Sequence, residues 1–382
     1  MNKPKSILRL VALSLLLSAS TLNPAVAQDI PPEAAELMKP LPLSPTGQPV
    51  VGFPEGAPAS PATALTFTDE ELATLKAGGF KAGIAMQALD SPWNTLQVEA
   101  LTKTLGEYGI DVVAVTDAKQ SPTAQADHLD GMVAQGVDLI FSVPIDPQGQ
   151  AETYQRVSQS GVKIVFMDNV AYGMAPGKDY VTVVASDNEQ NAVFATDEMI
   201  AAMGGSGKVA LMTYIQEAYY SIAARVAGFE KSVKAHPGVE VVAREKFTQP
   251  REVFDKIIAV LTAHPDLKGV FAVWGDPAMQ AIAGAESIGR TDLVVTTNDL
   301  GPDSALYVAR DQIIAIGAQL PYDLGIAEAQ AGAAALLGKE VPPYISLPSL
   351  RVKKVNLLSA LKQVTKQDVP ADVIEACAGA CY

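Results

Sequence analysis

The sequence predicts an α/β protein with two doubly wound parallel-sheet lobes. Ten short apolar runs rich in β-branched residues alternate with longer stretches whose apolar positions recur every three or four residues. Alternating strands and helices of this kind build parallel sheets with helices on both faces. The runs are continuously apolar, as strands buried on both faces should be. Ten strands exceed one ordinary sheet, so we expect two sheets of about five or six strands each.

The predicted strands share this apolar character. In chain order they span residues 81–86, 111–116, 138–143, 163–167, 181–185, 208–213, 239–244, 269–273, 292–297 and 313–318. The stretches between them have helical periodicity, for example Leu96, Ala100, Leu101 and Leu105. Ligands of open parallel sheets bind beyond the carboxyl ends of the strands. The residues that follow each strand are therefore the candidate site.

Residues 1–27 have the pattern of a secretory signal peptide. The charged n-region, the apolar run and the small-residue cleavage pattern are Lys3, Lys5 and Arg9, then Leu10–Leu17, then Ala25–Ala27. An uncleaved anchor is the alternative, but the apolar run is far shorter than the roughly 20 residues of a spanning helix. We expect cleavage before Gln28 and a soluble exported protein, without membrane insertion.

Residues 28–65 differ in composition from the rest of the chain because nine prolines lie between Pro31 and Pro61. Proline fixes φ and removes a backbone donor, so we expect neither helix nor sheet to run through this stretch. The interpretation is an extended, largely disordered arm that acts as a spacer. A docking role for the arm stays open.

Composition argues against several functions. The formal net charge is −14, with 28 Lys plus Arg against 42 Asp plus Glu, which makes the chain a poor partner for nucleic acid. The three histidines, His128, His236 and His264, lie in separate segments without metal-ligand spacing. Neither a nucleophile elbow nor a phosphate-binding or dinucleotide-binding glycine motif is present. We therefore expect no catalytic activity, no metal and no cofactor.

Two cysteines, Cys377 and Cys381, lie in the tail formed by residues 357–382. In an oxidising compartment they could form a small local disulfide. We interpret them as a structural clip of the tail and leave open whether they are bonded.

Polar and aromatic residues gather where the predicted strands end. Carboxylates, amides and guanidinium groups offer paired donors and acceptors for adjacent hydroxyls, and indole faces pack on the C–H faces of a small ring or polyol. The candidate ligand-binding residues are Asp90, Ser91, Trp93, Asn94, Asp168, Asn169, Arg225, Trp274, Asp276, Asn298, Asp299 and Gln319.

Several stretches resemble the periplasmic sugar-binding proteins of the ribose-binding type, which serve ABC importers. They are ALDSPWNTLQVEALTKTLGEYGIDVVAVTDA, VKIVFMDN, VVASDNEQNAVFATDEM, RVAGF, LTAHPDLKGVFAVW and IAIGAQLPYDLG, in an order that matches the family from about Phe80 to Arg351. The resemblance implies the type 1 periplasmic binding fold, in which three crossings join the lobes. These crossings would lie near 185–186, 319–320 and 348. The N-terminal lobe would then hold 66–185 and 320–347, and the C-terminal lobe 186–319 and 348–356.

The resemblance also implies binding roles. Trp93 lies where the family has a stacking aromatic, and Asp168 where it has an aspartate that binds sugar hydroxyls. Arg225, within Arg-x-x-Gly-Phe, matches the ligand-binding arginine, and Gln319 the hinge-side glutamine. Either Asn298 or Asp299 matches the aspartate that ends a late strand, and this choice stays open.

Three departures from the family leave the ligand undetermined. Asp90-Ser91 replaces an Asn-Asn type pair, and Asn169 stands where ribose-type proteins carry a second arginine. Residues 274–277, Trp-Gly-Asp-Pro, replace an Asn-Asp pair followed by Met-Ala. Unpaired buried carboxylates are costly, so the ligand should supply many hydroxyl donors or a positive charge. We expect a polyol, cyclitol or pentose-like ligand, with a cationic or amino-bearing compound as the alternative.

The function implied is that of a periplasmic solute-binding protein of an ABC importer. The protein would be a monomer that closes on its ligand and delivers it to an inner-membrane permease. Two other classes stay open: a receptor that presents its ligand to a chemotaxis or sensor protein, and an exported enzyme. Neither the exact ligand nor the permease can be read from the sequence.

Overall fold

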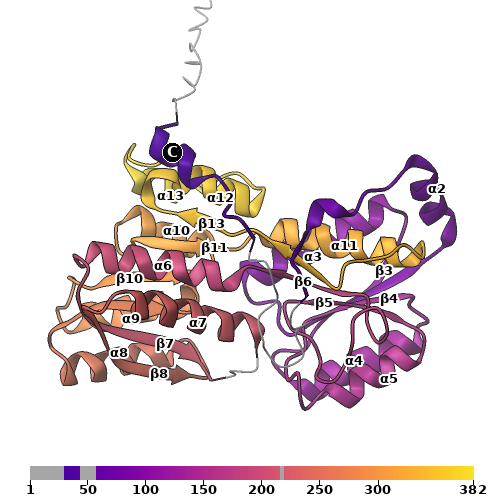
Figure 1. Cartoon of the computed structure of the whole chain (residues 1–382), viewed down its shortest axis with the longest axis horizontal. Coiled ribbons are helices and arrows are strands. Elements are labelled where there is room, and N and C mark those ends of the chain that lie inside the picture. Colours follow the sequence, from indigo (N-terminus) through magenta and orange to yellow (C-terminus); the bar gives the residue numbers. More distant parts are fainter. Residues whose placement is uncertain (1–29, 44–56, 216–218) are drawn as a thin grey trace, which may run out of the picture.

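The computed structural model describes residues 30–43, 57–215 and 219–382, so the predicted signal peptide lies outside the described residues. Two helix-covered sheets lie side by side (Figure 1). The first lobe is built on a seven-stranded sheet of order β1-β12-β6-β5-β4-β2-β3, and the second on a six-stranded sheet of order β13-β11-β10-β9-β7-β8. The predicted α/β class with parallel-sheet lobes is confirmed.

The strands of the first lobe are β1 (Ser60–Pro61), β2 (Lys81–Met86), β3 (Asp111–Asp117), β4 (Leu139–Ser142), β5 (Lys163–Met167), β6 (Thr182–Ser186) and β12 (Tyr344–Leu347). Those of the second lobe are β7 (Gly207–Tyr214), β8 (Val239–Phe247), β9 (Leu267–Ala272), β10 (Val294–Asn298), β11 (Ala315–Ala318) and β13 (Leu350–Val352). All neighbouring pairs run parallel except β11 and β13.

The α-helices are α1 (Pro32–Leu37), α2 (Asp69–Gly78), α3 (Pro92–Glu107), α4 (Pro122–Ala134), α5 (Ala151–Gln159), α6 (Asn188–Ala202), α7 (Tyr220–Ala235), α8 (Glu252–Ala263), α9 (Gly275–Ser287), α10 (Pro302–Ala309), α11 (Pro321–Leu336), α12 (Leu357–Thr365) and α13 (Ala371–Cys377). In the first lobe α3 and α11 pack together on one face of the sheet, and α4 and α5 lie on the other (Figure 1). Among the described residues, no helix has the length and apolar character needed to span a bilayer.

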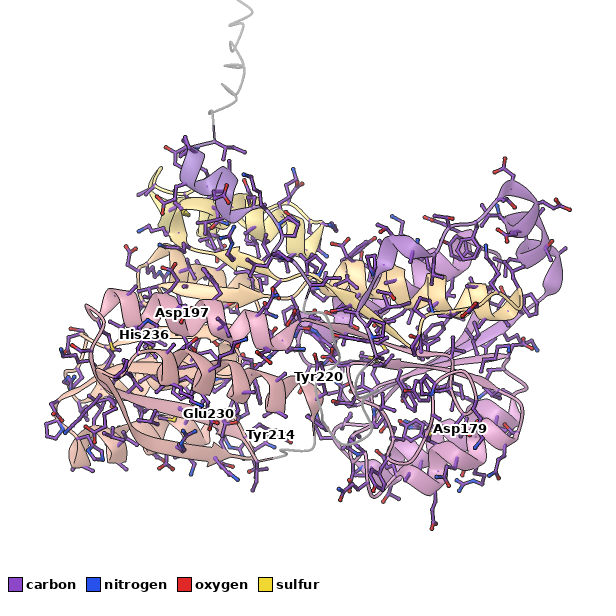
Figure 2. All side chains as sticks on the ribbon, in the orientation of Figure 1. Asp179, Asp197, Tyr214, Tyr220, Glu230 and His236 are labelled. Carbon is purple, nitrogen blue, oxygen red and sulfur yellow. A yellow bond between two sulfur atoms is a disulfide. The ribbon has the colours of Figure 1, made fainter. Side chains whose placement is uncertain are left out.

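The chain passes between the lobes three times. It leaves the first sheet after β6 and enters α6, which packs against β10 and β11 of the second lobe; Figure 2 labels Asp197 on this helix. It returns between β11 and α11, and it crosses again between β12 and β13. Each crossing is short, so a rotation about these three segments can open or close the space between the lobes.

The expectation of an arm with neither helix nor strand is wrong for its described parts. Helix α1 begins at Pro32, where the first turn of a helix needs no backbone donor. Strand β1 pairs with β12 at the sheet edge, the position in a sheet where proline is tolerated. Leu37 is buried, and Arg351 donates a hydrogen bond to the carbonyl of Glu36. Proline content therefore limited the length of these elements without preventing them.

The C-terminal tail is folded against the second lobe. Cys377 and Cys381 form a disulfide with a Cα–Cα distance of 5.5 Å. The last residue is fixed from two sides, because the Tyr382 N–H donates to the Val355 carbonyl and its carbonyl accepts from the Ser359 N–H, both at 3.0 Å. The disulfide thus closes the turn that carries the chain end back to α12.

Replacing both cysteines with serine should lower the free energy of unfolding by roughly 2 kcal/mol, because the closed loop no longer restricts the unfolded chain. The measurement is urea unfolding of Cys377→Ser/Cys381→Ser beside the wild type. Wild-type protein treated with dithiothreitol should match the variant. An unchanged midpoint in both samples would show that the bond contributes nothing to stability.

Candidate ligand-binding site

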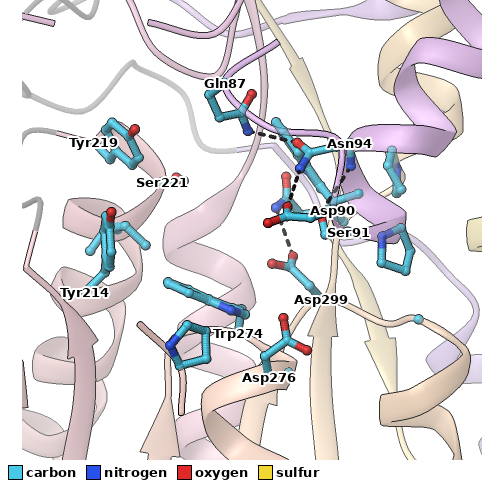
Figure 3. Close-up of a pocket in the computed structure, with 18 of the residues that line it drawn as sticks. Gln87, Asp90, Ser91, Asn94, Tyr214, Tyr219, Ser221, Trp274, Asp276 and Asp299 are labelled. Carbon is cyan, nitrogen blue, oxygen red and sulfur yellow. Dashed lines mark hydrogen bonds between the residues drawn. The ribbon is translucent and has the colours of Figure 1, made fainter. Parts of the chain in front are cut away.

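A cavity of about 320 Å³ lies between the lobes, at the carboxyl ends of both sheets. Its walls come from the β2–α3 loop and the end of β5 in the first lobe, and from the ends of β7, β9 and β10 in the second. Helix α7 and the crossing at Gln319 complete it. We call this cavity the interlobe pocket; Figure 3 shows it in close-up. Its volume suits a ligand of small-molecule size.

The predicted site residues come together here with one exception. The lining includes Asp90, Ser91, Trp93, Asn94, Asp168, Asn169, Arg225, Trp274, Asp276, Asp299 and Gln319. Asn298 does not line the interlobe pocket: it is fully buried, and its Nδ2 donates to the Gly317 carbonyl at 3.2 Å. Of the two residues left open by the sequence, Asp299 is therefore the one that reaches the pocket.

The first-lobe wall is organised by the start of α3. Ser91 caps the helix by accepting from the Asn94 N–H, and Pro92 occupies the first turn. Gln87 Nε2 donates to Asn94 Oδ1 at 2.8 Å, and Asn94 Nδ2 reaches Asp90 Oδ1 at 3.5 Å. This chain of bonds fixes the loop that carries Asp90 and Trp93 (Figure 3).

Asp168 is the most buried acid of the interlobe pocket. Only 4% of its surface is exposed, and its Oδ1 has no hydrogen-bond partner among the described residues. The residue adopts φ of +57°, a left-handed conformation that aspartate tolerates better than most residues. Burial raises the pKa of Asp168 to about 7; the Arg225 charge opposes this rise and the Asp299 charge adds to it.

Arg225 holds the second-lobe wall together. Its guanidinium pairs with Asp299 through two bonds of 2.8 and 3.0 Å, and it also donates to Asn188 Oδ1 and the Val273 carbonyl. Gln319 Nε2 donates to the same Asp299 carboxylate at 2.9 Å. The four bonds that Arg225 itself donates use four of its five N–H groups, which leaves one N–H on Nη2 for a ligand.

Helix packing explains the glycine and the phenylalanine of the Arg-x-x-Gly-Phe segment. A Cβ atom at Gly228 would lie 2.4 Å from the carbonyl oxygen of Glu189, so only glycine lets α7 approach α6 this closely. That approach brings Arg225 to Asn188 on α6. Phe229 is fully buried and stacks on Phe271 of β9, which fixes the rotation of α7 about its axis.

Aromatic rings form the wall opposite the carboxylates. Trp274 makes edge contacts with Tyr214 and Phe247, at ring-centroid distances of 5.6 and 5.0 Å. Tyr214 and Tyr219 also line the interlobe pocket (Figure 3). Our list of candidate residues omitted both tyrosines, although Tyr214 ends β7 and Tyr219 immediately precedes α7, in the same strand-to-helix connection where we looked for site residues.

Further lining residues were also missed, among them Gln87, Ser221, Gln249 and Asp303. Gln87 directly follows β2, and Asp303 lies in the first turn of α10. Both lie in stretches that follow a strand, which is where we expected the candidate site. Ser221 lies at the start of α7, and Gln249 lies in the loop after β8.

Two contacts join the lobes beside the interlobe pocket. Asn169, at the end of β5, accepts a hydrogen bond of 2.8 Å from the Tyr220 N–H at the start of α7. A Cβ atom on Gly301 would lie 3.2 Å from Pro92 Cγ, so these two loops touch across the opening.

Carboxylates outnumber cations in the interlobe pocket. Asp90, Asp168, Asp276, Asp299 and Asp303 line it with Arg225 as the single basic residue among the described lining. Asp276 is exposed by surface area, but nearby protein atoms partly desolvate its carboxylate; this raises the pKa of Asp276, and the charges of Asp303, Asp90 and Asp299 raise it further. Within the described ranges, no three acidic, histidine or cysteine side chains are arranged to hold a metal ion.

The unliganded protein should lose stability as the pH rises from about 4 to 7. Asp168 binds its proton more tightly in the folded state, with a pKa near 7, than in the unfolded chain, with its ordinary value of 3.8, so ionisation between these values favours unfolding. Glu328, which is fully buried on α11 and has no partner among the residues described, has a raised pKa and acts in the same direction.

Urea unfolding of wild type and Asp168→Asn at several pH values measures the contribution of Asp168. The variant should show a smaller loss of stability over this range, with the remainder due to Glu328 and other groups. Equal pH dependence in both proteins would contradict the raised pKa.

The family model described as "Periplasmic binding protein domain" matches residues 82–340. The chain belongs to this family. The ribose import binding protein RbsB of Escherichia coli is 25% identical over 264 residues, covering 68% of this chain and 85% of the relative. The Bacillus subtilis protein of the same name is 26% identical over 270 residues, covering 70% and 86%. The resemblance seen in the sequence is therefore confirmed.

Solved structures show the same fold. An Agrobacterium radiobacter carbohydrate transporter solute-binding protein in complex with D-arabinose matches with a TM-score of 0.67 and 22% identity, covering 75% of this chain and 99% of the other. An ABC transporter solute-binding protein from Mycobacterium smegmatis with bound glycerol matches with a TM-score of 0.68 and 23% identity, covering 77% and 100%.

Proposed function

We propose that the protein is the solute-binding component of an ABC importer, and that it holds a small sugar, polyol or cyclitol between its lobes. The observation that carries this is the interlobe pocket, which draws hydrogen-bonding side chains from both lobes and places indole rings beside them. Alternating hydroxyls and C–H faces of a polyhydroxy compound match such a lining. The names of the relatives, which are import binding proteins for ribose, support the same ligand class.

A ligand that contacts both lobes stabilises the closed form by its differential affinity for it. Asp168 belongs to the first lobe and Arg225 to the second, so one small molecule in contact with both bridges the opening. The closed protein then presents a surface made of both lobes to a permease. We place it in the periplasm, as its family implies, and assign it no catalytic step.

Isothermal titration calorimetry with D-ribose, D-arabinose, D-allose, allitol and glycerol tests the proposal. At least one compound should bind with a dissociation constant of about 1 μM or below, one molecule per chain. Sugar recovered after prolonged incubation should be chemically unchanged. Absence of binding to this set and to the compounds named in the next section would overturn the assignment, and conversion of the sugar would point to an enzyme.

A further inference from the structure

The interlobe pocket contains more free acceptors than free donors. Within the part of the chain that the structure describes, Gln87 Oε1, Asp168 Oδ1 and Gln319 Oε1 are buried without a partner, and all three residues line the pocket. Gln319 must turn its Nε2 toward the Asp299 carboxylate, because a carboxylate only accepts, so its oxygen stays free. Among the described lining residues, the free buried donors are Trp93 Nε1, which has no partner, and the remaining N–H of Arg225 Nη2. A ligand that satisfies these atoms must therefore supply mainly hydrogen-bond donors.

The charge of the interlobe pocket points in the same direction. Among the described residues, Asp90, Asp168, Asp276 and Asp303 form no ion pair, and the positive charge of Arg225 is already matched by Asp299. The helices that begin at the pocket each contribute about half a positive charge, and the raised pKa values of Asp168 and Asp276 favour their protonated forms, so only part of the negative charge remains. Asp90, Asp276 and Asp303 are exposed to water, which a ligand placed over them would displace. A neutral polyol would supply no charge in place of this water, whereas a cation would.

The carboxylates also oppose closure of the lobes. Asp90 belongs to the first lobe, whereas Asp276 and Asp299 belong to the second, and Figure 3 shows the three on the side of the pocket opposite Tyr214 and Tyr219. Closing the lobes brings these like charges together, as the effect of Asp90 on the pKa of Asp276 shows. A cation between them would turn this repulsion into attraction.

We propose that the ligand carries a protonated amine: an amino sugar or amino polyol whose ammonium group lies between Asp90 and Asp276. An ammonium group supplies three donors, no acceptor and one positive charge. The hydroxyls of the same molecule reach Asp168 and Gln319, and its carbon face lies against Trp93 and Trp274. This inference rests on the proposed function, because it names a subclass of the compounds assigned to the same pocket.

Calorimetric titration with matched compounds tests the inference. The pairs are D-glucitol with D-glucamine, ribitol with 1-amino-1-deoxyribitol, and D-galactose with D-galactosamine, all near neutral pH. In the pair that fits the interlobe pocket, the amine should bind about tenfold tighter or more, a difference that added salt reduces. A neutral member that binds as tightly as its amine, or more tightly, would overturn the inference and leave the proposed function standing.

Failure of all six compounds, together with the five neutral compounds above, would instead overturn the proposed function. Asp276→Asn should reduce the preference for the amine to about threefold or less. Asp127→Asn, an exposed aspartate on α4 outside the pocket, is the matched control and should keep the full preference. The wild-type comparison decides the inference even if Asp276→Asn fails to fold. Retention of the full preference in a folded Asp276→Asn variant would contradict the proposed position of the ammonium group.

Discussion

Arg225→Ala is expected to weaken ligand binding by about a hundredfold or more. The substitution removes the donor that remains for a ligand and the two bonds that hold the Asp299 carboxylate. It also leaves Asn188 Oδ1 and the Val273 carbonyl without their partner. An uncompensated carboxylate then faces the interlobe pocket and repels the other acids in it. Calorimetry with the preferred ligand measures the loss.

The same substitution should lower the free energy of unfolding by about 3 kcal/mol, because it breaks a largely buried ion pair. Arg225→Lys keeps the charge but cannot form the bidentate pair, so binding should recover only in part. Lys231→Ala, which removes an exposed lysine of the same helix, should leave the affinity unchanged. Wild-type affinity in Arg225→Ala would exclude Arg225 from the site.

Asp168→Asn is expected to weaken binding by about tenfold to a hundredfold. The buried Oδ1 of Asp168 has no partner among the described residues and belongs to the pocket lining, so we expect a ligand donor to bond to it. Asparagine keeps the size of the side chain and tolerates the left-handed backbone, so the change tests the carboxylate rather than the fold. Calorimetry with the same ligand gives the ratio of dissociation constants.

The matched control is Asp311→Asn, because Asp311 also has a left-handed backbone, with φ of +59°, but lies outside the interlobe pocket. This variant should bind like the wild type. Asp168→Ala should lose binding as well and should also lose stability, because alanine is strained at this backbone conformation. Unchanged affinity in Asp168→Asn would mean that no ligand group reaches this carboxylate.

The strands that the sequence predicted best are long apolar runs. Residues 81–86 and 163–167 match β2 and β5 at both ends, since each run stops where polar residues or glycine begin. Strands β12 and β13 were missed because they have four and three residues and lie beside prolines. Their pairing with β6 and β11 depends on partners far away in the chain, which local patterns do not record.

For the site too, local patterns predicted the position, whereas the contacts depend on distant parts of the chain. The residues that follow the strands located the interlobe pocket, because parallel strands bring all their carboxyl ends to one edge. The choice between Asn298 and Asp299 required the backbone: Asp299 takes φ of +66° after the last residue of β10, and this turn directs it into the pocket. The pairing of Arg225 with Asp299 joins residues 74 positions apart, so composition alone revealed the acidic excess but not which acid is neutralised.

Intrinsic tryptophan fluorescence during ligand titration tests the central claim most directly. The chain has two tryptophans, Trp93 and Trp274, and the structure places one from each lobe in the interlobe pocket. Binding should produce a saturable change, and Trp93→Phe and Trp274→Phe should each keep part of it. Calorimetric binding of a ligand without any change in fluorescence would place the ligand elsewhere and contradict the account.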